Sequence, residues 1–338
     1  MQAELQKDTT PFRVPDRTLA TPVDPEGTQP ARNLIDVDAL SNRDIDRIFR
    51  RAAALREAST PLGNMTVQTL RGHIAAMLFF EPSTRTRLSF ELAAQRLGAA
   101  AIPLEVSRSS IEKGEALYDT LQTLVALGVT IAILRHPDSN VYERLCGRSD
   151  ISLLNAGHGV MAHPTQALLD GFTLERRLGC LQDKTIVLCG DIVHSRVARS
   201  NLRMLQRMGA RLILCGPPQF LPSLDDIPQL TEVRIAALDD VLESADAIMC
   251  LRIQRERHVP DAGKSDQPID YLQEYGLTEE RFARTHPDCV LLHPGPVNRG
   301  VELAAELVED PRSLILEQVK NGLYIRMAVL EWLARVLK

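Results

Sequence analysis

Short apolar runs recur along most of the chain, and segments with the spacing of amphipathic helices separate them. The first series covers residues 74–80, 99–104, 129–134 and 151–154, and the second covers 185–189, 211–215, 245–251 and 289–292. Near-continuous apolar runs that alternate with helices are typical of parallel sheets whose two faces are both covered. The pattern predicts an α/β fold with two doubly wound parallel-sheet domains joined by helices.

Four segments outside these runs have distinct patterns. Ser41 is the expected N-cap of a helix that reaches Leu55 with apolar residues at helical spacing. The helix predicted over 164–178 lies between the two series, so we expect it to connect the domains. The last helical stretch, 322–337, could pack on either domain. Residues 1–33 contain five prolines and little apolar periodicity, which predicts a flexible or partner-bound arm.

The composition is that of an ordinary folded protein, because 44% of the 338 residues are hydrophobic and 25% are charged. This length favours two domains. The net charge of -5 argues against a broad basic surface for nucleic acid. No apolar run approaches the roughly 20 residues that cross a bilayer, and no secretory pattern opens the chain. We therefore expect a cytoplasmic protein with no nucleic acid and no membrane as partner.

The six cysteines stand singly, several of them inside apolar runs. A structural zinc site needs ligand-spaced pairs such as C-x-x-C, and a disulfide scaffold needs a denser spacing. We therefore expect reduced core cysteines and no metal site.

The strongest local signal follows the first predicted strand. The sequence Ser-Thr-Arg-Thr-Arg at residues 83–87 leads from that strand into a helix. Free N–H groups at a helix N-terminus, together with hydroxyls and a guanidinium, suit a phosphate or another small oxyanion. Helix capping also explains Ser and Thr at such a position, but capping does not require two arginines beside the cap.

Other polar residues follow predicted strands at the edge where α/β sheets bind ligands. Arg135 comes directly after the run at 129–134. In the second half, Arg196 and Arg252 each follow a strand, and two guanidiniums can clamp the two carboxylates of a dicarboxylic amino acid. Gln254 could add a hydrogen bond. The sequence thus favours an anion site in the first half and an amino-acid site in the second.

Three motifs resemble, in order, those of the transcarbamoylase family, which contains the aspartate and ornithine carbamoyltransferases. They are Ser-Thr-Arg-Thr-Arg at 83–87, His-Pro-Thr-Gln at 163–166 and His-Pro-Gly-Pro-Val-Asn-Arg at 293–299. The resemblance runs from about residue 33 to the C-terminus. It implies transfer of a carbamoyl group from carbamoyl phosphate to L-aspartate, the committed step of de novo pyrimidine biosynthesis, without cofactor or metal.

The resemblance also implies roles for single residues. The carbamoyl phosphate site would consist of Ser83, Thr84, Arg85, Thr86, Ser109, Arg135, His163, Gln166 and the backbone carbonyls of Gly295 and Pro296. Four residues would be catalytic: Thr86, Arg135, His163 and Lys113. The first three would stabilise the oxyanion. The aspartate site would consist of Lys113, Arg196, Arg252 and Gln254.

The segment from Ser109 to Glu115 resembles a mobile loop that, in this family, reaches into the active site of the adjacent subunit. The resemblance therefore implies a homotrimer with shared active sites, and it leaves association with a regulatory or dihydroorotase-like subunit open. It also implies a domain order. Residues 34–163 would form the carbamoyl phosphate-binding domain, and a C-terminal helix at 318–338 would pack back on it. Residues 164–317 would form the aspartate-binding domain.

Three other functions compete with this interpretation. An NAD-linked oxidoreductase is disfavoured because G-x-G-x-x-G is absent after the strand at 185–189. Ornithine carbamoyltransferase would need an Asp-x-x-x-Ser-Met-Gly motif and His-Cys-Leu-Pro, and a noncatalytic scaffold homologue would have lost site residues. Two positions depart from the family pattern, since His158 replaces a common Asp and Val193 a common Lys. We expect these departures to affect loop stability or regulation more than chemistry.

Overall fold

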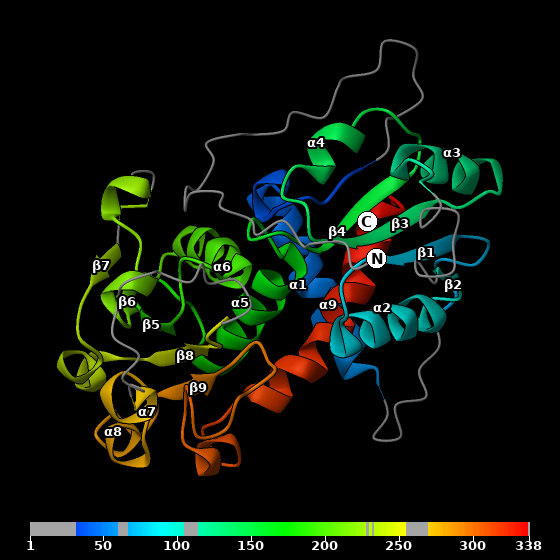
Figure 1. The fold of residues 1–338 in the computed structure, drawn as a ribbon. Helices are drawn as coiled ribbons and strands as arrows, with labels where there is room; N and C mark the ends of the chain where they lie inside the picture. Colours follow the sequence, from blue (N-terminus) through cyan, green and yellow to red (C-terminus); the bar gives the residue numbers. More distant parts are fainter. Residues whose placement is uncertain are drawn as a thin grey trace. The chain divides into compact units, whose positions relative to one another are not determined.

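The computed structural model describes residues 32–59, 67–104, 114–227, 230–231, 233–254 and 270–336, and these divide into two compact units (Figure 1). The first unit comprises residues 32–172 and 319–336, and the second comprises residues 173–318. Ser109, Lys113 and nearly all of the predicted arm at 1–33 lie outside the described residues. No described helix is long and apolar enough to span a membrane.

The first unit is built around a parallel four-stranded sheet with the strand order β2-β1-β3-β4. The predicted strands are confirmed, with ends that differ by at most four residues. The strands are β1 (Ile74–Phe79), β2 (Ala100–Leu104), β3 (Ile131–His136) and β4 (Ser152–His158). The helices are η1 (Val37–Ala39), α1 (Asn42–Glu57), α2 (Thr84–Arg96), α3 (Leu117–Ala126), α4 (Val141–Leu145) and the start of α5 (Pro164–Leu178).

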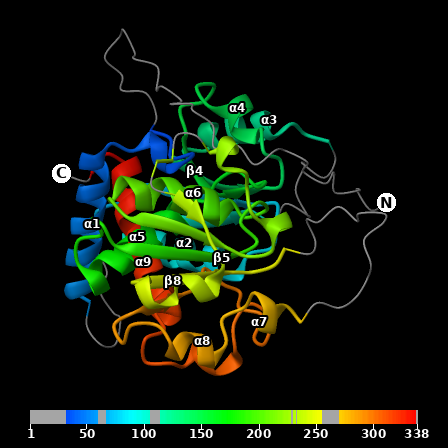
Figure 2. The same ribbon diagram turned by 90° about the vertical axis from the view of Figure 1, so that its left-hand side faces the viewer.

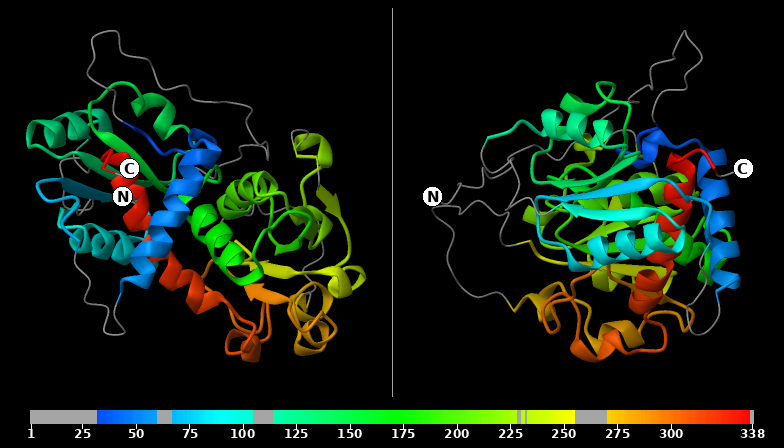
Figure 3. Two further views of the ribbon diagram at one scale, coloured as in Figure 1. Left: turned by 180° about the vertical axis from the view of Figure 1, so that it is seen from behind. Right: turned by 90° about the vertical axis from the view of Figure 1, so that its right-hand side faces the viewer.

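Local sequence signals set the ends of the helices in this unit. Ser41 caps α1 as predicted, and Asp44 completes a capping box by bonding back to the backbone N–H of Ser41. The last helix, α9 (Ile315–Leu333), begins seven residues before the predicted start at Gly322. It runs beside α1, where Arg51 donates to Glu331 at 2.6 and 2.7 Å (Figure 3). The prediction that the C-terminal helix packs on the first domain is confirmed.

The second unit is built around a parallel five-stranded sheet with the order β7-β6-β5-β8-β9. Its strands are β5 (Thr185–Gly190), β6 (Arg211–Cys215), β7 (Val233–Ile235), β8 (Ala247–Leu251) and β9 (Val290–Leu292). Its helices are α6 (Arg196–Arg207), α7 (Tyr271–Glu274) and α8 (Glu279–Ala283), with 3-10 turns η4 (Pro218–Phe220), η5 (Leu224–Asp226), η6 (Leu238–Asp240), η7 (Leu242–Ser244) and η9 (Ala305–Val308). The sequence pattern missed β7, a short edge strand whose residues are partly or largely exposed.

Both faces of this second sheet are buried, as continuous apolar strands predict. One face packs on Leu202 and Leu205 of α6. The other packs on Leu242 of η7 and on Phe282 of α8, and Figure 2 shows α8 next to α7 beyond β8. Successive side chains of a strand point to opposite faces of the sheet. Because both faces are buried, polar side chains are expected only at the ends of the strands.

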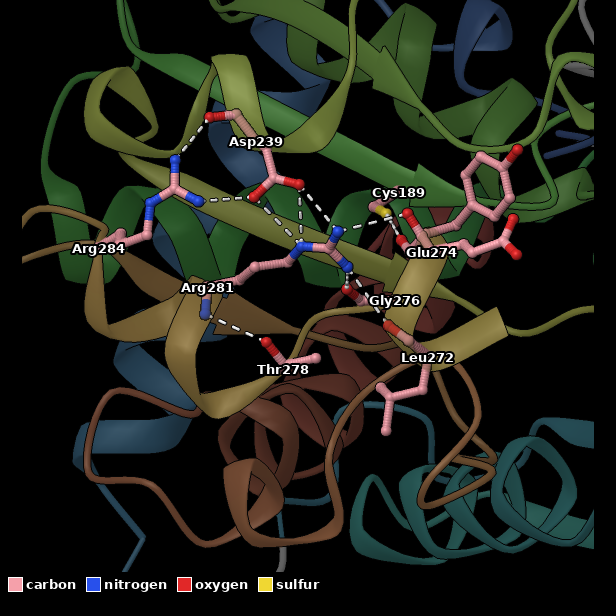
Figure 4. Close-up of polar contacts among 9 residues, drawn as sticks. Cys189, Asp239, Leu272, Glu274, Gly276, Thr278, Arg281 and Arg284 are labelled. Carbon is pink, nitrogen blue, oxygen red and sulfur yellow. Dashed lines mark hydrogen bonds and ion pairs between the residues drawn. The ribbon is translucent and has the colours of Figure 1, made fainter. Parts of the chain in front are cut away.

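Polar contacts also hold α7 and α8 to the rest of the second unit (Figure 4). The Arg281 guanidinium donates to Asp239 at 2.8 Å and to the carbonyl of Gly276 at 2.8 Å. It also donates to the carbonyls of Leu272 and Glu274, both at 3.3 Å. Arg281 thus satisfies carbonyls left open at the end of the short helix α7.

Candidate active site

In the first unit, the residues predicted to bind phosphate lie at the topological switch point of the sheet, where the strand order reverses. The chain runs from β1 outward to β2 and then returns to the other side of β1 as β3, so the switch point lies between β1 and β3. Ligands of open α/β sheets bind at the carboxyl ends of the strands at such a point. The 83–87 segment follows β1, and Arg135 lies near the end of β3 in register with Phe79.

The start of α2 has the features of an anion site. Ser83 is the N-cap residue, but its side chain makes no capping hydrogen bond. Thr86 is buried in the first turn of the helix. The purely structural explanation of Ser83 as a capping side chain therefore fails, and the hydroxyl and the first N–H groups of the helix suit an anion.

Arg135 is held beside this segment by two contacts. Its Nε lies 3.3 Å from the Glu81 carboxylate, and its Nη1 donates to the carbonyl of Ala156 at 3.5 Å. Glu81 comes two residues before Ser83, so the guanidinium lies close to the loop that precedes α2. Sequence reasoning did not assign Glu81 a role, although an acid next to a predicted anion site signals a partner for an arginine.

His163 and Gln166 open α5 at the same edge of the sheet. The loop before α5 is tied to β4, because the N–H of His158 donates to the carbonyl of Ala162 at 3.3 Å. The side chains of His163 and Gln166 are both buried. The Gln166 amide Nε2 donates to the buried Asp170 carboxylate at 2.9 Å, one helical turn later.

His158, the first departure from the family pattern, belongs to a buried polar cluster. The Asn155 amide donates to the carbonyl of Ile35 at 2.6 Å and contacts Nδ1 of His158 at 2.8 Å. The N–H of Gly157 donates to the Asn155 carbonyl oxygen, which fixes the orientation of the amide. Since an amide nitrogen can only donate, Nδ1 of His158 accepts, and the neutral ring carries its proton on Nε2. His158 therefore contacts the amide that orients this loop.

In the second unit, the switch point lies between β5 and β8, since β6 and β7 extend to one side and β9 to the other. Arg196 begins α6 after β5, and Arg252 and Gln254 follow β8. Gly190 allows the two strand ends to approach closely, because a Cβ there would lie 2.4 Å from the carbonyl oxygen of Leu251. The structure thus brings the three predicted amino-acid-binding residues to one edge of the sheet.

One buried carboxylate joins the two loops at this edge. Asp191 accepts from the ring Nδ1 of His194 at 2.7 Å and from the backbone N–H of Gln254 at 3.2 Å. The Gln254 side chain in turn donates from Nε2 to the carbonyl of His194 at 3.0 Å. Asp191 has no exposed surface. Val193, the second departure, donates its N–H to the carbonyl of Phe220 at 3.0 Å and packs against the core.

The turn after β9 carries Gly295 and Pro296, which are joined by a cis peptide bond. The N–H of Gly295 donates to Nδ1 of His293 at 2.8 Å, so the proton of the His293 ring is on Nε2. That Nε2 donates to Glu302 at 3.1 Å, and both side chains are fully buried. Hydrogen bonds to the histidine therefore shape the turn that presents the two carbonyls.

The predicted residues thus form two groups, one in each unit. Ser83, Thr84, Arg85, Thr86, Arg135, His163 and Gln166 lie in the first unit, and Arg196, Arg252, Gln254, Gly295 and Pro296 lie in the second. The sequence interpretation missed the acids that hold these groups, Asp170 and Asp191. The signals were present, since Asp191 lies two residues after a predicted strand and Asp170 lies four residues after Gln166.

Two family models match the two halves of the chain. The model described as aspartate/ornithine carbamoyltransferase, carbamoyl-P binding domain, matches residues 32–176. The model described as aspartate/ornithine carbamoyltransferase, Asp/Orn binding domain, matches residues 182–333.

Curated relatives and solved structures are similar over most of the chain. The aspartate carbamoyltransferase catalytic subunit of Chloroflexus aurantiacus is 44% identical over 305 residues, 90% of this chain and 98% of that protein. The corresponding subunit of Maricaulis maris is 45% identical over 304 residues, 89% of this chain and 93% of that protein. Aspartate transcarbamoylase from Trypanosoma cruzi, in a crystal structure with carbamoyl aspartate and phosphate, is 30% identical with a TM-score of 0.80. That match covers 89% of this chain and 95% of that chain.

Proposed function

The chain belongs to the aspartate/ornithine carbamoyltransferase family, and we propose that it transfers the carbamoyl group of carbamoyl phosphate to L-aspartate. The products are N-carbamoyl-L-aspartate and phosphate. This reaction would supply the biosynthesis of pyrimidines, and we place it in the cytoplasm. The observation that carries the aspartate assignment is the pair Arg196 and Arg252 after two adjacent strands, because two guanidiniums match a dicarboxylic substrate.

The first unit is proposed to bind carbamoyl phosphate. The phosphate would accept from the N–H groups at the start of α2, from the side chains of Ser83, Thr84 and Thr86, and from Arg85. Arg135 and His163 would reach the carbonyl oxygen, and Gln166 the carbamoyl amino group. The backbone carbonyls of Gly295 and Pro296 would accept from that amino group and from the incoming amine.

Chemistry would proceed by attack of the neutral α-amine of aspartate on the carbonyl carbon. A carbon–nitrogen bond forms, the bond to the phosphate oxygen breaks, and the departing phosphate takes the amine proton. Thr86, Arg135 and His163 stabilise the oxyanion of the tetrahedral intermediate, and losing one such donor costs about 2.7 to 4 kcal/mol of barrier. Binding both reactants in one pocket supplies much of the remaining rate enhancement.

The orientation of Gln254 refines its proposed role. Its side-chain nitrogen uses one of its two hydrogens on the carbonyl of His194, which leaves a second N–H to donate and the carbonyl oxygen to accept. A carboxylate of aspartate cannot donate to that oxygen, whereas the amino group can. The second N–H of Gln254 can also donate to a carboxylate, so we assign the carboxylates of aspartate to Arg196 and Arg252 and one further hydrogen bond to Gln254.

A direct assay tests the function. The purified protein is incubated with carbamoyl phosphate and either L-aspartate or L-ornithine, and carbamoylated product is measured. We expect product with aspartate only. Product with ornithine would identify the other branch of the family, and no product with either amino acid would identify a scaffold homologue.

We also propose a homotrimer in which Ser109 and Lys113 complete the site of the neighbouring subunit. The support is the match of the 109–115 segment to the interlocking loop of the family. The test mixes an inactive Lys113→Ala variant with an inactive Arg135→Ala variant and lets the subunits exchange. In a cyclic trimer, one of the three head-to-tail interfaces of each mixed hybrid is native, so partial activity should return.

Recovery of about one site per mixed trimer supports shared sites, because cyclic symmetry allows no more. The two parent variants, each exchanged with itself, are the controls and should stay inactive. Absence of recovery after confirmed exchange would show that each chain contains a whole site. An association with a regulatory or dihydroorotase-like subunit is a separate proposal, which copurification of such a subunit with the native protein would support.

A further inference from the structure

The amide group of Gln166 is held in one of its two orientations. Its Nε2 lies 2.9 Å from Oδ1 of Asp170, and both side chains are buried on α5. An ionised carboxylate only accepts hydrogen bonds, so the Gln166 nitrogen must face it. The carbonyl oxygen of Gln166 then points the other way and is available as an acceptor.

Arg326 of α9 provides the positive charge that favours the ionised form of Asp170. The Arg326 side chain is buried, and burial lowers the pKa of its guanidinium to about 10, while the neighbouring Asp170 acts to raise it. Arg85 of the phosphate segment is close enough to lower the same pKa electrostatically. The guanidinium therefore interacts electrostatically with both Asp170 and the arginine of the phosphate segment.

The surroundings of Arg326 are shaped to hold this guanidinium. It lies over the ring of Phe90 on α2, 5.1 Å from the ring centroid, which favours a cation. Gly322 lies one turn earlier on α9, where a Cβ would come within 2.7 Å of Nη1 of Arg326. A glycine inside a helix costs stability, so its position here is explained by the space that the arginine needs.

We propose that Asp170, which is hydrogen-bonded to Gln166, is the positioning residue that makes the enzyme select a carbamoyl group. It fixes Gln166 so that the amide presents an acceptor, and the amino group of carbamoyl phosphate is a donor. An acyl phosphate with a methyl group in place of the amino group has no donor there, so it forms no hydrogen bond with the Gln166 carbonyl oxygen. This inference rests on the proposed function and assigns it a specificity residue.

The test uses Asp170→Asn, because an asparagine can donate to Gln166 and so permits the reversed amide. Binding is compared for carbamoyl phosphate and for acetyl phosphate, which has a methyl group where carbamoyl phosphate has its amino group. We expect the dissociation constant of carbamoyl phosphate to rise about tenfold, the effect of one hydrogen bond. The inhibition constant of acetyl phosphate should change less than twofold.

The matched control is Glu331→Gln. Glu331 is another buried acid of the first unit, and it pairs with Arg51 instead of facing the site. This variant should lose stability without a change in the carbamoyl to acetyl preference. If Asp170→Asn does not fold, Arg326→Gln and Arg326→Lys replace it. The neutral variant should lose the preference, and the lysine variant, which keeps the charge, should retain most of it.

A parallel loss of affinity for both acyl phosphates would overturn the proposal, since a general distortion of the site predicts that result. A preference unchanged in Asp170→Asn and in Arg326→Gln would also overturn it. Failure of the proposed function gives a different result, because the wild-type protein would then form no carbamoyl aspartate at all.

Discussion

The two units place their sites at the same point of the fold but build them differently. Each site lies at a switch point, where the strand order of a parallel sheet reverses, at the carboxyl ends of the two strands beside that point. In the first unit, the site residues start helices α2 and α5 or end a strand, and Asp170 and Arg326 lie behind them. In the second unit, the loops after β5 and β8 are joined through the single acid Asp191.

This difference predicts how each site responds to mutation. An anion at a helix N-terminus is bound by several N–H groups that the helix itself holds in place. A loop has no such support, and its geometry depends on particular side-chain contacts. We therefore expect the binding of aspartate to fail through one positioning residue, and the ground-state binding of carbamoyl phosphate to tolerate more single changes among the residues that support its site.

The largest effect is expected for Asp191→Asn. Asparagine must turn its NH2 group toward either the His194 ring or the N–H of Gln254, so one buried donor loses its acceptor. A loss of this kind costs about 1 to 3 kcal/mol, which corresponds to an increase of about 5- to 150-fold in the KM for aspartate. The affinity for carbamoyl phosphate should change less than twofold, which steady-state kinetics with each substrate varied would measure.

Asp246→Asn is the control for this variant. Asp246 also joins β5 and β8, but at their amino ends, where it accepts from the N–H of Thr185 at 2.8 Å and from Lys184 at 2.9 Å. This variant should lower stability and leave both KM values unchanged. An equal rise in the aspartate KM for both variants would mean that general strand alignment matters, and the special role of Asp191 would be lost.

The sequence predicts the strands well and the supporting residues poorly, for physical reasons. Eight strands are recognisable because each is a run of apolar residues. Most of these runs are buried, although β2 at a sheet edge is largely exposed, and the three-residue edge strand β7 has no such run. The sequence predicts a start of the last helix at Gly322, but α9 begins at Ile315, and Gly322 lies within the helix next to the Arg326 guanidinium. Asp191 lies near a predicted strand end, but its role depends on Gln254, which is 63 residues away, and no local pattern predicts that pairing.

The second prediction tests whether the second unit binds aspartate alone. Arg252→Lys keeps the positive charge but replaces a planar fork with a single ammonium group, so one hydrogen bond to the carboxylate is lost. We expect the KM for aspartate to rise about tenfold, the equivalent of about 1.4 kcal/mol. The KM for carbamoyl phosphate should stay the same.

Arg211→Lys is the matched control, since Arg211 begins β6 at the opposite end of the sheet and pairs with the exposed Asp183. It should have no kinetic effect. If Arg252→Lys raised both KM values equally, the arginines of the second unit would serve both substrates, and the comparison between the units would no longer hold.

The smallest effect on activity is expected for Arg281→Gln, which tests whether α7 and α8 belong to the site or to the scaffold of the second unit. The variant loses the pairing with Asp239 and the bonds to three backbone carbonyls, so we expect a loss of about 1 to 3 kcal/mol in the free energy of unfolding.

The hydrogen bond from Arg281 is the main cause of the lowered pKa of Asp239, whose ordinary value is 3.8. A lowered carboxyl pKa stabilises the fold above the ordinary value, and this contribution is lost as the pH falls through the folded value. The gap in melting temperature between wild type and variant should therefore narrow below about pH 4, without closing, because the carbonyl bonds do not titrate. Arg284→Gln, which removes an exposed pairing with the same acid, should cost less at every pH. Both KM values should stay within twofold for both variants. A selective rise in the aspartate KM for Arg281→Gln would mean that the aspartate site depends on this second support, and not on Asp191 alone.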